Sequence, residues 1–280
     1  MPLGVSDNLF KRIVSALTLL PLVLGLVYLG GWWFFALLAA GGWLMMMEWC
    51  QLTGVDDKKY IILNTIAALL FPAFITLYGD SNQITVLIVI LLVIFSLGLA
   101  SSPPRKMSIW VSTANPKKNA FVGMAYVTLA LVSLAWLRTQ DEHGMIVIWT
   151  LFAVWAMDVG GYFAGKGIGG PKLAPKLSPK KTWAGLIGGM VLAAAVSLFI
   201  SLFFSLGDPL LMPFAGAIVA LVAQFGDLYE SAIKRTMNKK DSGDLIPGHG
   251  GILDRVDGLI FAAPVVAFAL TVPTLSVTGS

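Results

Sequence analysis

The chain has few of the side chains on which soluble enzymes and metal-binding domains rely. Its 280 residues include one cysteine, two histidines and only 12% charged side chains. The single cysteine excludes an intrachain disulfide and a CxxC metal site, and two isolated histidines disfavour a zinc centre. The formal net charge of +4 is carried by short clusters between apolar runs, which is not the pattern of a nucleic-acid-binding protein.

Apolar residues dominate instead, at 57% of the chain with a mean hydropathy of +0.83. These values are typical of polytopic membrane proteins. We therefore predict an all-α integral membrane protein that forms a single domain over residues 1–280. A spanning helix needs about 20 mostly apolar residues. Nine segments qualify, at roughly 13–31, 32–52, 60–79, 84–100, 120–137, 145–162, 182–205, 209–233 and 252–274.

The basic residues are divided unequally between the two sides of these spans. Of the 19 lysines and arginines, all but Arg138 fall on the side of the N-terminus. If the number of spans were wrong by one, every later loop would change sides and the bias would disappear. The bias therefore supports all nine spans together. Basic loops mark the cytoplasmic side of a membrane protein. We predict a cytoplasmic N-terminus and a C-terminus outside.

Five acidic residues lie in or beside the apolar spans, at a depth that this topology places near the cytoplasmic interface. They are Asp158, Asp227, Glu230, Asp254 and Asp257. A charge at the centre of a span costs about 2.5–3.5 kcal/mol on insertion scales, so such residues often mark function, although a lone acid at a helix end often only caps it. Carboxylates without a cysteine or histidine pair suit Mg²⁺, which prefers oxygen ligands.

Two polar segments on the same predicted side have the composition of phosphate-binding sites. In 178–185, Ser-Pro-Lys-Lys-Thr-Trp-Ala-Gly, we expect Ser178 to start a helix with proline at its first position. The two lysines and Thr182 would then hold a phosphate. In 247–251, Pro-Gly-His-Gly-Gly, the glycines let backbone N–H groups approach an anion at a helix start. For His249, a structural and a functional role stay equally open.

The segment 231–257 carries a long pattern of mixed charge. It reads Ser-x-Ile-Lys-Arg, four residues, Lys-Asp, then Gly243, Ile246-Pro247, His-Gly-Gly, Ile252 and Asp-Arg-Val-Asp. This pattern resembles the signature of the phosphatidate cytidylyltransferases (CDP-diacylglycerol synthases), without a departure in its 27 residues. The 178–185 segment, Asp158-x-Gly-Gly-Tyr and Gly226-Asp227-Leu228 are also similar to that family.

The resemblance implies a reaction and a setting. The reaction is transfer of CMP from CTP to phosphatidate, which gives CDP-diacylglycerol and pyrophosphate for phospholipid biosynthesis. It would depend on Mg²⁺, and a second cation in the same site stays open. The implied setting is the lipid bilayer of a cell membrane, most simply a bacterial inner membrane, with a multi-pass homodimer whose active site faces the cytoplasm. The catalytic half would be residues 145–275.

The same resemblance assigns candidate roles to individual residues. The candidate metal ligands are Asp227 and Asp254, followed by Asp257 and Asp158. The candidate catalytic residues are Asp227, Asp254, Lys234, Arg235, His249 and Arg255. The candidate substrate-binding residues are Ser178, Lys180, Lys181, Thr182, Lys240, Asp241, Gly250 and Gly251. For Glu48, near the inner end of the second span, we favour a packing role over a place in the site.

Two other classes of protein stay open at this point. A CDP-alcohol phosphotransferase also handles CDP-lipids, but of its hallmark DGx₂ARx₈Gx₃Dx₃D the chain has only the first two residues, Asp257-Gly258. A cation channel or proton-coupled transporter also places acids in spanning helices. The clustering of the acids on one side, with none plainly at mid-membrane, argues against the second alternative.

Overall fold

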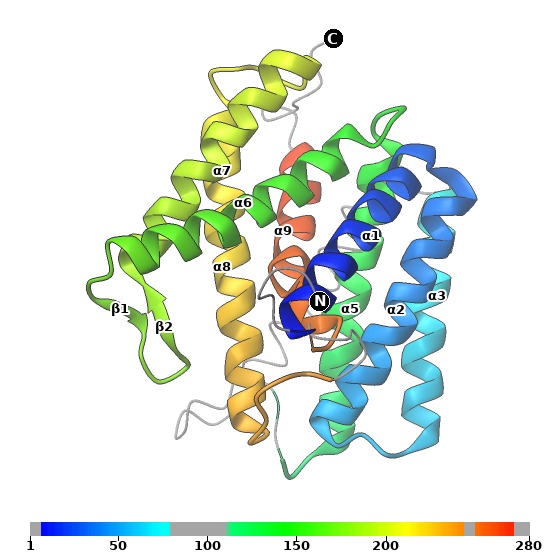
Figure 1. Cartoon of the computed structure of the whole chain (residues 1–280). Helices are drawn as coiled ribbons and strands as arrows, with labels where there is room; N and C mark the ends of the chain where they lie inside the picture. The colour runs from blue at the N-terminus through cyan, green and yellow to red at the C-terminus, as the bar shows by residue number, and fades with distance from the viewer. Residues whose placement is uncertain (1–6, 79–110, 112, 244–249, 272–280) are drawn as a thin grey trace.

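The computed structural model describes residues 7–78, 111, 113–243 and 250–271, and this part of the chain is almost entirely helical (Figure 1). The helices are α1 (Asp7–Leu29), α2 (Gly31–Thr53), α3 (Lys58–Tyr78), α5 (Pro116–Thr139), α6 (Met145–Gly167), α7 (Trp183–Phe204), α8 (Met212–Thr236) and α9 (Leu253–Thr271), and the strands are β1 (Lys172–Ala174) and β2 (Ser178–Thr182). Each of these helices overlaps a predicted span, with ends that differ by up to six residues, whereas the strands were not predicted. The predicted span at 84–100 lies outside the described residues.

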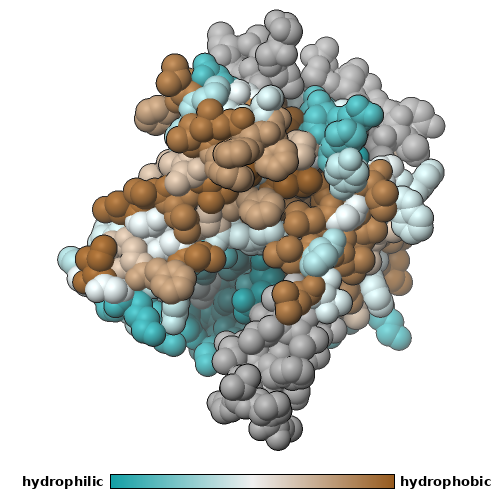
Figure 2. All heavy atoms as spheres, turned by 45° about the horizontal axis from the view of Figure 1, so that its top comes forward, coloured by the Kyte–Doolittle hydropathy of each residue, from teal (hydrophilic) through white to brown (hydrophobic). Residues whose placement is uncertain are grey.

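Helix length and composition indicate a multi-pass membrane protein. Among the described helices, α2, α5, α6, α7 and α8 are long and apolar enough to cross a membrane. Large apolar side chains of α7, such as Ile187, Val191 and Phe203, are exposed on the surface, as expected of a helix that faces lipid. Figure 2 shows this broad hydrophobic surface, broken on one face by a recess with hydrophilic walls.

Helix α9 lies between two groups of helices. On one side α2, α3 and α5 pack together, and on the other side α6, α7 and α8 pack together (Figure 1). Helix α9 contacts α5 in the first group and α8 in the second. The acidic first turns of α9 can therefore be reached by side chains from both halves of the molecule.

Local chemistry explains where the helices begin and end. Helix α5 starts at Pro116, and the side chain of Asn115 accepts a hydrogen bond of 3.0 Å from the Lys118 N–H. Proline at the first helical position and asparagine at the N-cap are both favoured. Helix α2 ends at Thr53 and is capped by Gly54, whose φ of +70° is easy only for glycine and whose N–H bonds to Cys50 O.

One expectation for the basic loop was wrong. Ser178 does not start a helix, because 178–182 forms strand β2, which pairs antiparallel with β1. Helix α7 begins at Trp183, and Thr182 caps it by accepting a hydrogen bond of 3.1 Å from the Gly185 N–H. Proline is compatible with an edge strand as well as with a helix start, and threonine is itself a good N-cap. Helix α6 also continues to Gly167, past its predicted end at 162.

The lone basic residue on the predicted outer side has a structural role. Arg138 lies in the last turn of α5 and donates hydrogen bonds to the last carbonyls of α1, Val27 O at 2.6 Å and Tyr28 O at 3.0 Å. Helix C-termini leave such carbonyls without partners inside the helix. The arginine therefore joins α1 to α5, which accounts for its departure from the charge bias.

Helices α6 and α7 approach each other closely at Gly160, the first of two consecutive glycines. A Cβ on Gly160 would lie 2.7 Å from Gly188 O and 2.9 Å from Gly189 Cα, both backbone atoms of α7. A Cβ on Gly161 would meet no atom nearer than 3.6 Å, which is ordinary contact. Only the first glycine of the Asp158-x-Gly-Gly-Tyr motif is therefore required for the close crossing that positions Asp158.

We expect Gly160→Ala to lower the melting temperature of the purified protein and Gly161→Ala to leave it unchanged or raise it. The added methyl group at 160 forces the two backbones apart, at a cost of about 1–3 kcal/mol for overpacking. At 161 the methyl group has space, and alanine is the better helix former. Thermal unfolding in detergent compares the two variants. Equal melting temperatures would contradict the assigned crossing.

Candidate active site

Three carboxylates from three helices gather near one lysine. Asp158 of α6, Asp227 of α8 and Asp257 of α9 are close enough for their charges to interact with one another and with Lys181 of β2. Lys181 Nζ forms an ion pair with Asp227 Oδ2, and Ser231 Oγ donates a hydrogen bond of 3.4 Å to Asp227 Oδ1. We call Asp158, Asp227, Asp257 and Lys181 the Asp227 cluster.

A glycine explains why two of these acids are neighbours. The backbone of α9 passes so close to α8 that a Cβ on Gly226 would collide with Asp257 O and lie 3.2 Å from Gly258 Cα. Since only glycine allows this approach, the Gly226-Asp227 pair brings the carboxylate of Asp227 beside that of Asp257. The motif is thus both a packing contact and a site element.

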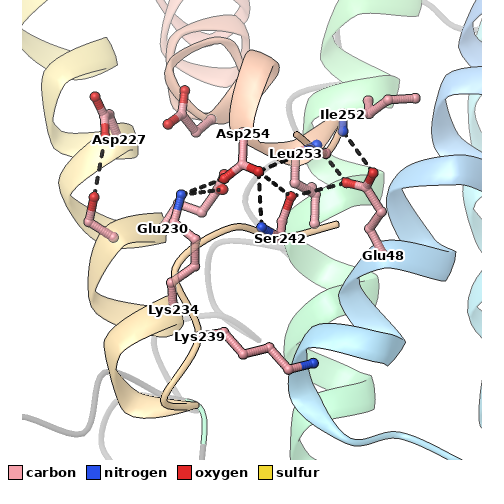
Figure 3. A network of polar contacts seen from close by, with 12 residues as sticks. Glu48, Asp227, Glu230, Lys234, Lys239, Ser242, Ile252, Leu253 and Asp254 are labelled. Carbon is pink, nitrogen blue, oxygen red and sulfur yellow. Dashed lines mark hydrogen bonds and ion pairs between the residues drawn. The ribbon is translucent and has the colours of Figure 1, made fainter. Parts of the chain in front are cut away.

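A second group of charges lies beside the first (Figure 3). Lys234 Nζ pairs with Glu230 Oε1 at 3.1 Å and with Asp254 Oδ1 at 2.6 Å, and all three side chains are largely buried. Asp254 Oδ2 also accepts hydrogen bonds from Ser242 N and Oγ, each at 2.9 Å, and from Gly251 N at 3.0 Å. We call Glu230, Lys234, Ser242 and Asp254 the Asp254 cluster. It joins the end of α8, the segment after it and the start of α9.

Glu48 contacts this second cluster, although we expected it to be a packing residue outside the site. Its side chain is buried, with 1% of its surface exposed, but its carboxylate accepts hydrogen bonds from Ile252 N at 2.8 Å, Leu253 N at 2.9 Å and Ser242 Oγ at 3.2 Å. The feature of the sequence that could have indicated this role is an acidic residue alone within an apolar span. The sequence did not reveal its partners, which lie about two hundred residues further along the chain.

The side chains of the Asp227 cluster are of a chemical type that suits a magnesium ion. Its three carboxylates are hard oxygen ligands of the sort that Mg²⁺ uses together with substrate phosphates. Within the described part of the chain, however, no three His, Cys, Asp or Glu side chains already converge as a metal site. A cation at Asp227 would have to compete with Lys181, which holds that carboxylate in this structure. The first-choice ligands Asp227 and Asp254 belong to two adjacent clusters, not to one.

The charged site adjoins a large apolar cavity. The cavity has a volume of about 720 Å³ and lies between α1, α2, α5, α6 and α9. Asp158, Asp254 and Arg255 contribute its charged lining, and the remaining lining residues are apolar, among them Leu38 and Leu131. A molecule with a charged head and a long apolar body would match both parts of this lining.

The remaining sequence-predicted residues lie around the two clusters. Lys180 is exposed on β2 next to Lys181, and Lys240 and Asp241 are exposed after α8. Arg235 is exposed at the end of α8, where its Nη1 donates a hydrogen bond of 3.5 Å to Lys239 O. Gly250 has a φ of +83°, and a Cβ there would lie 3.1 Å from Asp254 Oδ2. His249 lies outside the described residues.

Comparisons with known proteins identify the family. A model of the cytidylyltransferase family matches residues 10–272. A protein of Brucella suis named phosphatidate cytidylyltransferase is 35% identical over 92% of this chain and 91% of its own length. Proteins of the same name from Pseudomonas aeruginosa and Synechocystis are 34% and 30% identical, over 93% and 95% of this chain and 96% and 98% of their own lengths. Because the family model and these relatives match nearly its whole length, the chain belongs to the cytidylyltransferase family.

Proposed function

We propose that this chain is a phosphatidate cytidylyltransferase, which transfers CMP from CTP to phosphatidate and releases pyrophosphate. The observation that carries the proposal is the adjacency of the two charged clusters to the 720 Å³ apolar cavity. Phosphatidate combines a phosphate monoester with two acyl chains, so the two surfaces match the two parts of one substrate. The names of the relatives supply the nucleotide and the lipid.

The chemistry needs positioning and charge more than it needs a strong base. The phosphate monoester of phosphatidate has a second pKa of about 6, like other phosphate monoesters, and is largely dianionic at neutral pH. One of its oxygens attacks the α-phosphorus of CTP, forming a new P–O bond while the bond to pyrophosphate breaks. No proton has to be removed from the nucleophile. The site must instead hold two polyanions in line against their mutual repulsion.

The residues of the site divide this work. Asp227, Asp257 and Asp158, with Asp254 beside them, are the proposed holders of Mg²⁺, which supplies positive charge to the phosphates when bound. A second cation in the same site remains part of the proposal. Lys181, Lys180 and Arg255 supply the side-chain charges that attract phosphate oxygens. Lys234 has a different task, because its pairs with Glu230 and Asp254 keep the start of α9 in place.

The proposed setting is the bacterial inner membrane, with nine spans, the N-terminus in the cytoplasm and the site on that side. Single cysteines test this topology cleanly, because the one native cysteine, Cys50, is buried. We expect a cysteine in place of Lys176, in the turn between β1 and β2, to react with impermeant thiol reagents only from the cytoplasm. A cysteine in place of Asp208, between α7 and α8, should react only from outside. The reverse pattern would contradict the orientation. The homodimer is a separate proposal, tested by light scattering in detergent.

Purified protein with CTP and phosphatidate tests the function. We expect CDP-diacylglycerol and pyrophosphate in equal amounts with Mg²⁺, and neither when a chelator removes the cation. A CDP-alcohol phosphotransferase would instead consume CDP-diacylglycerol and an alcohol and release CMP. An ion transporter would give flux through proteoliposomes without CTP turnover. Either of these outcomes would overturn the proposal.

A further inference from the structure

We infer that Glu48 of α2 is a positioning residue for the active site, holding the start of α9 and, through Ser242, the carboxylate of Asp254. The hydrogen bonds of Glu48 go to the backbone N–H groups of Ile252 and Leu253 and to the hydroxyl of Ser242. The inference rests on the proposed function, because Asp254 matters only if α9 contributes to catalysis.

Glu48 caps the start of α9. The first N–H groups of a helix have no partner within the helix. At the start of α9, the N–H groups of Leu253 and of Ile252, the residue before it, point to the carboxylate of Glu48 (Figure 3). A side chain from a distant helix thus does the work that an N-cap residue usually does. Its negative charge also matches the positive end of the helix dipole. The cap fixes where α9 begins.

Ser242 links Glu48 to Asp254. The Ser242 hydroxyl lies 3.2 Å from Glu48 Oε2 and 2.9 Å from Asp254 Oδ2. One hydroxyl proton is shared between two carboxylates, and the Ser242 N–H adds a second bond to Asp254. A change at Glu48 therefore alters the partner of Asp254 without touching Asp254 itself. Outer residues of this kind typically change metal affinity or activity by about 10- to 100-fold.

The segments around Glu48 pack closely against its side chain. A Cβ on Gly251 would lie 2.5 Å from Glu48 Oε2 and would collide with Ser242 Oγ. A Cβ on Gly243 would lie 3.0 Å from Glu48 Oε1. Gly251 therefore leaves the space that Glu48 and Ser242 occupy, and Gly243 contacts Glu48 closely. Nearby on the same helix, Gln51 O accepts a hydrogen bond of 2.5 Å from Lys239 Nζ, which fastens the segment at a second point.

The test compares Glu48→Gln with Ser197→Ala, which serves as the matched control. Ser197 is also buried and accepts a hydrogen bond of 2.8 Å from Trp149 Nε1, but this contact joins α6 to α7 away from the site. Both variants should lower the melting temperature. Only Glu48→Gln should also lower kcat and raise the half-activating Mg²⁺ concentration, each by about 10- to 100-fold. Glu48→Asp, which keeps the charge, should recover part of the loss.

Hydrogen exchange adds a measurement that does not depend on turnover. The Ile252 N–H bonds to Oε1 of Glu48 and the Leu253 N–H to Oε2. In glutamine one of these two positions becomes an NH₂ group, which only donates, so the amide that faces it loses its acceptor. Peptides covering 250–258 should therefore exchange faster in Glu48→Gln and at the wild-type rate in Ser197→Ala. If Glu48→Gln does not fold, Ser242→Ala carries the kinetic test, because it breaks the link to Asp254 and leaves the cap in place.

The outcomes separate the inference from the proposed function. Unchanged exchange and unchanged Mg²⁺ dependence in Glu48→Gln, with only a lower melting temperature, would show that Glu48 is a packing residue and overturn the inference. A wild-type protein that forms no CDP-lipid would overturn the proposed function. In that case the exchange comparison still decides the link between Glu48 and α9, since faster exchange supports it and unchanged exchange refutes it.

Discussion

Replacing Asp227 with asparagine is expected to reduce kcat/KM for CDP-diacylglycerol formation by about 10³-fold. Removing one group that stabilises charge in a transition state typically costs about 10²–10³ in rate, and Asp227 is both a proposed metal ligand and the ion-pair partner of Lys181. Asparagine keeps the size of the side chain but loses its charge. Because 29% of the Asp227 side chain is exposed, the variant should still fold and melt near the wild-type temperature.

Asp208→Asn provides the control for this measurement. Asp208 is an exposed acid between α7 and α8, and its Oδ1 accepts a hydrogen bond of 2.8 Å from Leu210 N. The same chemical change there should leave turnover unchanged. Initial rates with labelled CTP and phosphatidate compare the two variants at saturating Mg²⁺. Wild-type turnover by Asp227→Asn would remove Asp227 from the site.

Lys234→Met is expected to lower the free energy of unfolding by about 3–5 kcal/mol, the usual cost of breaking a buried ion pair from one side. The lysine is the shared partner of Glu230 and Asp254, and the side chains of the three residues are only 12%, 1% and 8% exposed. Methionine fills similar space but leaves two carboxylates without their cation. Denaturant titration of the purified protein in detergent measures the loss, and activity should disappear with it.

A second substitution separates stability from activity in this triad. Adding Glu230→Gln removes one of the two uncompensated charges, so the double variant should regain much of the lost stability. Its activity should remain low, because Asp254 still lacks Lys234. Lys176→Met, at an exposed position between the strands, should change stability by no more than about 0.5 kcal/mol. A Lys234→Met protein as stable as this control would contradict the buried triad.

Much of the architecture follows from hydropathy, because a membrane imposes a simple length rule on apolar segments. The described helices overlap eight of the nine predicted spans, and five of them are long and apolar enough to cross a membrane. Three of the predicted acids, Asp158, Asp227 and Asp257, lie close to one another. The 231–257 signature pointed to the family that the comparisons confirm. These features are encoded within single helices or single motifs, and they could therefore be predicted from the sequence.

Other features depend on contacts that a single sequence does not display. The composition of residues 178–182 suits a helix start as well as a strand, and the pairing with β1 makes this segment a strand. The bonds of Glu48 cross from α2 to α9. Asp227 and Asp254 look alike in sequence, but the structure gives them different partners, Lys181 and Lys234. Tertiary packing decides each of these outcomes.

The most direct test of the proposed nucleotidyl transfer follows the phosphorus atoms of CTP. Purified protein would receive phosphatidate, Mg²⁺ and CTP labelled at either the α- or the γ-phosphate. Attack at the α-phosphorus predicts that α-label enters the lipid while γ-label appears only in pyrophosphate, in equal amount. The label should stay in CTP in the Asp227→Asn protein. Transfer of γ-label to lipid, or lipid labelling without pyrophosphate, would contradict the account.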